Sequence, residues 1–416
     1  MDRISELPDE LLVNILLFVP TKVAVSTSIL SKRWKYLWMW LPKLEFRDYS
    51  ASECRRLQCF LDRNLPLHRA PVIESFRLDV GCSCFKPETI NMWILNAVSH
   101  CLRELEILYE FYSAKPDIMP SNLFTCKSLV ILKLVGEILL DVPPMFSLPS
   151  LKTLKLQWVT YFSEETLQRL LSNCPILEDL VLYLRDYDIT GKLTIGVSSL
   201  QSLSLYIPYT HLIDGYVIET PALKYFKLRD YNYKSHYCLI ENMPNLLHAH
   251  IDIDVDLSDI RGLIRSISSV KHLAICLEAM LNEDFVFNQL EHLEVCICKE
   301  HSPNQLIRLL KASSNLQGLH LFLMEDHHEH NPHDMYDWNQ PSTIPECILS
   351  SLQSLSWSLY TGEPQQRDIV VYILKHALRL KTATITSSEF EVPKFEMLKE
   401  LSRSSRASTT CQLMFD

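Results

Sequence analysis

The sequence predicts an α/β protein in which a small helical unit is followed by a long solenoid of short parallel strands. Three observations support this: apolar residues at helical spacing in residues 5–41, a unit L-x-x-L-x-L that recurs from about residue 70, and a break in that rhythm near residue 325. The chain has 416 residues, of which 47% are hydrophobic and 22% charged. This composition is typical of a folded protein with a large core.

Charge and composition exclude several classes of protein. The formal net charge of −10 argues against a nucleic-acid backbone as the main partner, and no run of about 18 apolar residues is present to span a membrane. The N-terminus lacks the pattern of a secretory signal, so the 13 cysteines are expected to be reduced thiols. The 8 glycines form no phosphate-binding motif. We therefore expect a protein of the cytoplasm and/or nucleus that binds neither nucleic acid nor membrane.

Residues 5–41 predict three short helices in one compact unit. Pro8 suits the first helical position, because its missing N–H would be unpaired there, and Pro20 ends the first helix. A second helix is expected over Lys22–Ser28 and a third from Ser31 through Trp38. Apolar residues occur on nearly all sides of the first helix: Leu11, Leu12, Val13, Ile15, Leu16, Leu17, Phe18 and Val19. A unit of this size buries only part of that surface, which leaves an apolar face for a partner.

These residues resemble the F-box of plant F-box proteins. The resemblance rests on Ile4-Ser5-Glu6-Leu7-Pro8-Asp9-Glu10-Leu11-Leu12, on Pro20-Thr21-Lys22, and on Leu30-Ser31-Lys32-Arg33-Trp34 with Leu37-Trp38. It assigns residues 1–48 to the F-box, which in that family docks on a Skp-type adaptor of a cullin–RING ubiquitin ligase. The positions that match the docking surface are Leu7, Pro8, Leu11, Ile15, Leu16, Val19, Val23, Leu30 and Trp34. Several of them, including Val23 and Trp34, could equally hold the three helices together.

From about residue 70 to residue 330 the spacing is that of leucine-rich repeats. Successive copies begin at Leu102, Leu129, Leu151, Leu177, Leu200, Leu223, Leu246, Val270, Leu290 and Leu316. Such repeats stack one strand each into a curved solenoid, so we assign the regular apolar positions to the core. Helical returns are expected over Ser163–Leu171, after Ser258 and after Ser302, and an irregular return over 206–220.

Function in the array is expected on the outward side of the strands, where side chains alternate away from the core. One outward row contains Glu106, Lys133, Lys155, Val181, Ser204, Lys227, His250, Ala274, Glu294 and His320, and the next Leu108, Val135, Gln157, Tyr183, Tyr206, Arg229, Asp252, Cys276, Cys296 and Phe322. Aromatic and basic residues are common anchors of protein interfaces. The candidate substrate-binding residues are therefore Tyr183, Tyr206, Lys227 and Arg229. The alternative is a strand face that is only solvated.

An acidic, histidine-rich segment over residues 325–334 interrupts the repeats. Its histidines are His327, His328, His330 and His333. They could bind zinc or nickel, but no cysteine or histidine pair at structural-zinc spacing accompanies them, so we interpret the segment as a solvated linker. Cys82-x-Cys84 and Cys296-x-Cys298 are interpreted as strand packing, because positions i and i+2 share one face of a strand. No metal site and no cofactor is therefore expected.

Beyond this segment the repeat rhythm resumes. Leu352/Leu355/Trp357 and Leu380/Ala383/Ile385 predict two further strands, with a helix over 367–376 between them and a last strand near Cys411–Phe415. The stretch from Trp338 to Phe415 resembles the FBD domain, the C-terminal module of the plant F-box/FBD/leucine-rich-repeat family. We assign residues 331–416 to this domain and expect it to cap the open end of the solenoid.

The resemblance implies the substrate receptor of an SCF-type ubiquitin ligase. In this function the F-box holds a Skp-type adaptor, the solenoid holds an unknown protein substrate, and ubiquitin transfer takes place on other subunits. The chain itself then needs no catalytic residue. An enzyme that uses a Cys/His pair is another class, but no local nucleophile motif supports it. The remaining alternative is an interaction scaffold that binds the adaptor without delivering a substrate.

Overall fold

The structure of the chain is a computed structural model. It describes residues 4–48, 51–81, 85–109, 117–188, 190–241, 243–253, 260–277, 285–298, 302–324, 327, 338–388 and 392–416. The chain divides into two compact units, the first comprising Met1–Leu200 with His211–Ile213 and the second Gln201–Thr210 with Asp214–Asp416. Among the described residues, none of the helices combines the length and the apolar character that a membrane crossing requires.

The first unit begins with the predicted helical module. Its elements are η1 (Ile4–Glu6), α1 (Asp9–Leu16), α2 (Thr21–Ser26), η2 (Thr27–Ile29) and η3 (Trp34–Trp40). Pro8 stands one residue before α1 rather than inside it. The third segment is a 3-10 helix that begins at Trp34, later than predicted. Arg33 fastens the module, since its side chain donates hydrogen bonds to the Asp9 carboxylate at 2.7 Å and to the Leu7 carbonyl.

A parallel sheet follows in the first unit. Its strands in spatial order are β1 (Lys43–Asp48), β2 (Ser75–Val80), β3 (Glu104–Tyr109), β5 (Ile131–Gly136), β7 (Thr153–Gln157) and β9 (Asp179–Tyr183). The strands pair in the register of the repeat, so that Leu105, Leu132, Leu154 and Leu180 form one buried row. Fully burying a leucine side chain contributes about 1.5–3 kcal/mol, which makes such rows the core of the unit. The array already begins at β1, earlier than predicted.

The returns of the first unit combine helices with short strands. They contain α3 (Ala51–Asn64), η4 (Leu65–Leu67), α4 (Pro87–Ser99), β4 (Asp117–Ile118), η5 (Ser121–Thr125), β6 (Ile138–Leu140), β8 (Thr160–Tyr161), α5 (Glu165–Ser172) and β10 (Lys192–Gly196). The helix predicted over Ser163–Leu171 is confirmed as α5. Helices α3 and α4 were not predicted. Strand β6 pairs with both β4 and β8, which gives this side of the unit a small second sheet.

The second unit continues the same repeat with a longer parallel sheet. Its strands in spatial order are β11 (Ser202–Ile207), β13 (Tyr225–Asp230), β15 (His248–Ile253), β16 (His272–Leu277), β17 (His292–Cys296), β18 (Gly318–Phe322), β19 (Ser354–Tyr360), β20 (Thr382–Ser387) and β21 (Gln412–Phe415). Strand β18 pairs directly with β19, so the C-terminal segment extends the sheet of the repeats. Buried Trp357 lies beside Leu321 in that register and joins the two parts of the core.

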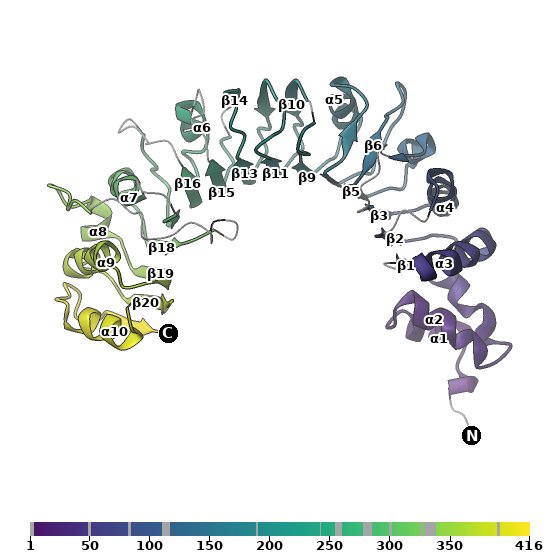
Figure 1. Cartoon of the computed structure of the whole chain (residues 1–416), viewed down its shortest axis with the longest axis horizontal. Helices are drawn as coiled ribbons and strands as arrows, with labels where there is room; N and C mark the ends of the chain where they lie inside the picture. The colour runs from purple at the N-terminus through teal and green to yellow at the C-terminus, as the bar shows by residue number, and fades with distance from the viewer. Residues whose placement is uncertain are drawn as a thin grey trace. The chain divides into compact units, whose positions relative to one another are not determined.

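The returns of the second unit lie along one side of its sheet (Figure 1). They contain β12 (Gly215–Glu219), β14 (Tyr237–Ile240), α6 (Ile260–Ser266), α7 (Ser302–Lys311), α8 (Glu346–Ser350), α9 (Pro364–His376) and α10 (Lys394–Arg403). The helices predicted after Ser302 and over 367–376 are confirmed by α7 and α9; Ser258 lies outside the described residues, and α6 begins at Ile260. The prediction of an irregular return over 206–220 is wrong for β12, which pairs with β14.

Among the described residues, Cys54 departs from the prediction of reduced thiols. The free thiols are Cys59, Cys101, Cys126, Cys174, Cys238, Cys276, Cys296, Cys298, Cys347 and Cys411. Cys54 in α3 is joined in a disulfide, so the prediction of reduced thiols is wrong for this residue. Cys82 and Cys84 lie outside the described residues.

Candidate functional site

The helical module at the start of the first unit leaves apolar side chains exposed. Those predicted to meet an adaptor and largely exposed are Pro8, Leu11, Ile15, Val19, Val23 and Leu30, while Leu7 is half-buried. Leu16 and Trp34 differ, because both are buried inside the module. These two side chains therefore hold the helices together and offer no surface to a partner.

Helix α1 is apolar on two adjacent faces, one buried and one exposed. Leu12 and Leu16 point into the module and are buried. Leu11 and Ile15 follow the same i, i+4 spacing one residue earlier, yet they are 47% and 44% exposed. Phe18, just beyond the helix, is also exposed. A contiguous apolar face on a short helix is a mark of a protein–protein contact rather than of an ordinary solvent surface.

The outward strand face of the first unit carries a row of alternating charges. Glu45, Arg77, Glu106 and Lys133 are register neighbours on β1, β2, β3 and β5. The Arg77 guanidinium lies 3.8 Å from Glu45 and 3.6 Å from Glu106, and the Lys133 amine lies 3.7 Å from Glu106 and 2.9 Å from Glu104. Burial lowers the pKa of Lys133, but the two glutamates outweigh it and raise the pKa above its ordinary value.

The four candidate substrate-binding residues divide between the two units. Tyr183 ends β9 in the first unit, whereas the other three lie on neighbouring strands of the second. Tyr206 is the register partner of Arg229, and Lys227 lies two residues before Arg229 on the same face of β13. All four side chains are half-buried. The structure therefore brings Tyr206, Lys227 and Arg229 together.

Further aromatic rings extend this part of the second unit. The ring of Tyr231 makes an edge contact with Tyr206 at 5.8 Å and stacks on Tyr209 at 5.3 Å, measured between ring centroids. Tyr209 is exposed, whereas Tyr231 is buried. Sequence reasoning missed Tyr209, because it lies outside the regular strand positions. We call Tyr206, Tyr209, Lys227 and Arg229 the aromatic–basic patch.

The outward face is covered farther along the second unit. Asp252, Cys276 and Cys296 were predicted to be outward, but all three are buried. Met324 and His327 lie against them and are themselves buried. The interpretation of residues 325–334 as a solvated linker is therefore wrong for His327, while His328, His330 and His333 lie outside the described residues.

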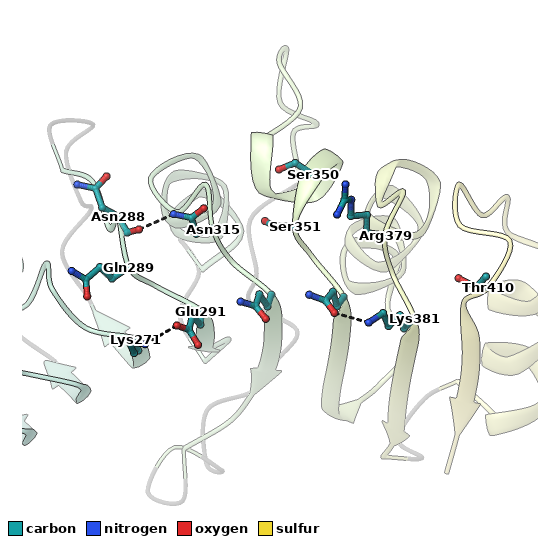
Figure 2. Close-up of a pocket in the computed structure, with 12 residues that line it drawn as sticks. Lys271, Asn288, Gln289, Glu291, Asn315, Ser350, Ser351, Arg379, Lys381 and Thr410 are labelled. Atoms are coloured by element: carbon teal, nitrogen blue, oxygen red, sulfur yellow. Dashed lines mark hydrogen bonds and ion pairs between the residues drawn. The ribbon is translucent and has the colours of Figure 1, made fainter.

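An open polar cleft of about 690 Å³ lies at the N-terminal ends of the strands of the second unit (Figure 2). Five of the lining residues recur at one repeat position, immediately before β16, β17, β18, β19 and β20: Lys271, Glu291, Gln317, Gln353 and Lys381. Lys271 pairs with Glu291 at 3.0 Å, and Lys381 donates a hydrogen bond to the Gln353 side chain at 2.8 Å. Since none of the described residues that line the cleft is a histidine or cysteine, it offers no nucleophile–base pair of that kind.

A histidine–aspartate pair in the second unit resembles part of a catalytic arrangement. His236 Nε2 lies 2.8 Å from Asp230 Oδ2, and the Tyr216 hydroxyl donates to the same oxygen at 3.1 Å. Burial lowers the pKa of His236, but its hydrogen bond and charge interaction with Asp230 raise it above the ordinary value overall. Because the His236 and Asp230 side chains are completely buried, a substrate cannot reach them. This network therefore stabilises the fold rather than performing chemistry.

Comparison with known proteins places three family models along the chain. Residues 4–46 match the F-box domain, residues 90–249 match the LRR repeats of FBD-associated F-box protein At5g56370, and residues 340–385 match FBD. These matches follow the order predicted for residues 1–48, 70–330 and 331–416, whose boundaries stay predictions.

Full-length relatives are found among proteins of Arabidopsis thaliana. FBD-associated F-box protein At4g10400 is 58% identical to this chain, and the match covers 100% of both chains. FBD-associated F-box protein At5g38590 is 51% identical over 96% of this chain and 98% of its own length. Putative F-box/FBD/LRR-repeat protein At4g00315 is 43% identical over 100% of both.

Proposed function

Since the chain belongs to the family of FBD-associated F-box/LRR-repeat proteins, we propose that it is the substrate-recognition subunit of an SCF-type ubiquitin ligase. F-box proteins are generally the substrate adaptors of such ligases and are typically non-catalytic. The chain would hold a Skp-type adaptor with its helical module and a protein substrate with its repeats. Its contribution to ubiquitin transfer would be proximity, because holding the substrate near the charged enzyme raises its effective concentration.

The exposed apolar face of α1 is the observation that carries the adaptor half of this proposal. Leu11 and Ile15 point away from the buried side of the helix, so a partner helix or groove can cover them without unfolding the module. Burying apolar surface contributes roughly 25 cal/mol per Å², and apolar side chains at i, i+4 spacing are the usual anchors of helix-in-groove contacts.

A charged double variant tests adaptor binding. Leu11→Asp with Ile15→Asp should weaken binding of a purified Skp-type adaptor at least tenfold, measured by calorimetry, because two charges would be placed in an apolar contact. Both side chains are exposed, so the circular dichroism of the full chain should not change. Leu378→Asp, at an exposed leucine of the second unit, is the matched control. Unchanged adaptor affinity in the folded double variant would contradict the proposal.

The aromatic–basic patch supports the substrate half. Its tyrosine rings provide apolar contact area. Lys227 and Arg229 add positive charge at successive outward positions of β13. Such a surface suits a protein segment that carries acidic and aromatic side chains. Tyr183 belongs to the same proposal only as a separate contact on the first unit.

Proximity labelling in cells tests the patch. Tyr206→Ala and Arg229→Ala should each reduce labelling of the proteins that accumulate when residues 1–48 are removed, while adaptor binding stays intact. Lys155→Ala on β7 is the control for loss of one basic side chain from a strand face. If both variants keep these partners, and deletion of residues 328–337 loses them, the patch is not the receptor.

The second candidate is a scaffold that binds the adaptor but delivers no substrate. It uses the same two surfaces, so the distinction requires the rest of the ligase. In the proposed function, the cullin copurifies with the chain and labelled partners become ubiquitinated in a reconstituted reaction. Adaptor binding without either result would favour the scaffold.

A further inference from the structure

Four potential metal ligands converge under the covered strand face of the second unit. Cys276 lies on β16, Cys296 is the last residue of β17, and Cys298 follows two residues later. His327 follows β18 in the sequence, and the four ligand atoms lie within 4.8 Å of one another. Cys276, Cys296 and His327 are at most 5% exposed. The three thiols thus come from β16, from the end of β17 and from the segment just after it, and a histidine completes the set.

The spacing of these atoms is that of a tetrahedral metal site. Zinc binds thiolate sulfur at about 2.3 Å and imidazole nitrogen at about 2.0–2.1 Å, which places tetrahedral ligands roughly 3.5–3.8 Å apart. His327 Nδ1 lies 3.6 Å from the Cys276 sulfur, 3.5 Å from Cys296 and 3.2 Å from Cys298. The sulfurs of Cys276 and Cys298 are 3.4 Å apart, whereas a disulfide requires about 2.05 Å.

The surroundings orient the ligands as they do in known metal sites. Asp252 Oδ1 lies 3.5 Å from His327 Nε2, on the nitrogen opposite to the one that faces the thiols. The other oxygen of Asp252 accepts a hydrogen bond of 2.5 Å from the Tyr231 hydroxyl. A carboxylate behind a ligating histidine fixes its tautomer and direction. The backbone N–H of Met324 also donates to the Cys296 sulfur at 3.5 Å.

We propose that Cys276, Cys296, Cys298 and His327 bind one Zn²⁺ ion in a closed structural site. Thiolate ligands with one imidazole select zinc over magnesium or calcium, and four protein ligands leave no open position for a substrate. The ion would hold His327 against the strand face, beside Met324. A partner could then contact the outward face only on strands that His327 and Met324 leave uncovered. The ion would also fix the position of His327 within the histidine-rich segment.

Metal content tests the proposal directly. The full chain, purified in reducing buffer without a polyhistidine tag, should contain about one zinc per chain by elemental mass spectrometry. After exchange, Co²⁺ should give the absorption bands of a tetrahedral cobalt–thiolate site. Cys298→Ser and His327→Ala should each lose most of the zinc, whereas Cys59→Ser, at an exposed thiol outside the cluster, should keep it.

A variant that removes no ligand keeps the test informative even if a ligand variant fails to fold. Asp252→Asn removes the carboxylate behind His327 but no ligand, so zinc affinity should fall about 10–100-fold in a chelator competition. The proposal is overturned if the wild-type chain neither contains zinc nor takes up Co²⁺. It is also overturned if zinc content is the same in Cys298→Ser and His327→Ala, or if mass spectrometry of the native chain finds a Cys276–Cys298 disulfide.

Discussion

The outward strand faces of the two units carry different kinds of chemistry, the first unit in one outward row and the second unit in the row beside it. In the first unit, Glu45, Arg77, Glu106 and Lys133 form an alternating row of half-buried charges on that face. In the second unit, the outward positions of β15, β16 and β17 hold Asp252, Cys276 and Cys296, and all three are buried. The strands, register and core are of the same kind in both units. What differs is whether another segment covers the face.

In the row of the second unit, Arg229 is half-buried whereas Asp252 and Cys276 are buried. A repeat position alone therefore does not determine whether a side chain is surface or core. A charge on an uncovered face is solvated and contributes little to stability. A thiol or carboxylate on a covered face must find partners within the protein, because water cannot supply them. The predictions below test this contrast, starting with the largest expected effect.

Truncating Met324, which covers Cys276 and Cys296 on the strand face, should lower the free energy of unfolding substantially. Met324→Ala deletes a side chain that is 2% exposed, and buried methionine-to-alanine changes lower the free energy of unfolding by about 2–5 kcal/mol. We expect this loss in urea denaturation of the full chain, with reduced hydrogen-exchange protection of β16 and β17. Met145→Ala, at a methionine that is 90% exposed in the first unit, should change stability by less than about 0.5 kcal/mol. Equal effects of the two substitutions would remove the contrast between covered and uncovered positions.

The ion pair of Arg185 with Glu137 in the first unit should contribute more to stability than the charge row does, because its carboxylate is buried. Arg185 holds both oxygens of Glu137, at 2.6 and 2.5 Å, and Glu137 is buried. Glu137→Gln should cost about 1–3 kcal/mol of unfolding free energy, because the guanidinium loses a charged bidentate partner. Glu45→Gln in the half-buried charge row is the matched substitution and should cost less than about 1 kcal/mol. If Glu45→Gln is the more harmful change, burial is not the deciding factor.

The two units should respond oppositely to acid at two buried histidines. Burial, and then the nearby charge of His100, lower the pKa of His68 from 6.5 to about 4. Its contribution to stability is therefore present above pH 6.5 and lost as the pH falls toward 4. The pKa of His236 is raised, so its contribution is present below pH 6.5 and lost as the pH rises through the higher value.

Urea denaturation at several pH values checks this opposition. The difference in stability between wild type and His68→Gln should shrink on acidification from pH 7 to pH 5. The difference for His236→Gln should grow over the same range. Two differences that move in the same direction would refute the assignment.

The smallest change in unfolding free energy is expected within the half-buried charge row of the first unit. Lys133→Ala removes contacts to Glu104 and Glu106 but leaves the core untouched, so it should cost at most about 1 kcal/mol. The cost should nearly vanish in 1 M salt, where the screening length is about 3 Å. A loss above 2 kcal/mol that persists in salt would show that this row is structural.

Periodicity predicted the fold well because each repeat buries the same positions. The apolar copies from Leu102 onward predicted strand order and register, and helical spacing together with helix start signals predicted α5, α7 and α9. Helices α3 and α4 were missed because they lie before the regular copies. At the N-terminus, the motif predicted which residues are apolar but not which of them turn inward. Leu16 was therefore assigned to the docking surface, and Trp34 was left open between docking and packing, whereas both are buried.

The cysteine cluster shows where sequence reasoning failed and which signal was present. Cys276 and Cys296 occupy equivalent positions of adjoining copies, so the aligned repeats already place them on neighbouring strands. Known zinc spacings describe ligands close in sequence, and this pattern does not fit them. The return of His327 over the face depends on a segment with no repeat signal, so nothing in the periodicity could reveal it.

The covering contact also has a consequence for the order in which the chain folds. Most contacts of the array join neighbouring copies, such as Lys271 and Glu291, which are 20 residues apart. Cys276 and His327 are 51 residues apart, and β17, α7 and β18 lie between them in the sequence. Because a chain is synthesised and folds from its N-terminus, the strand face stays open until residue 327 has emerged. Until then, a nascent chain exposes three thiols to oxidants, to metals and to the folding machinery.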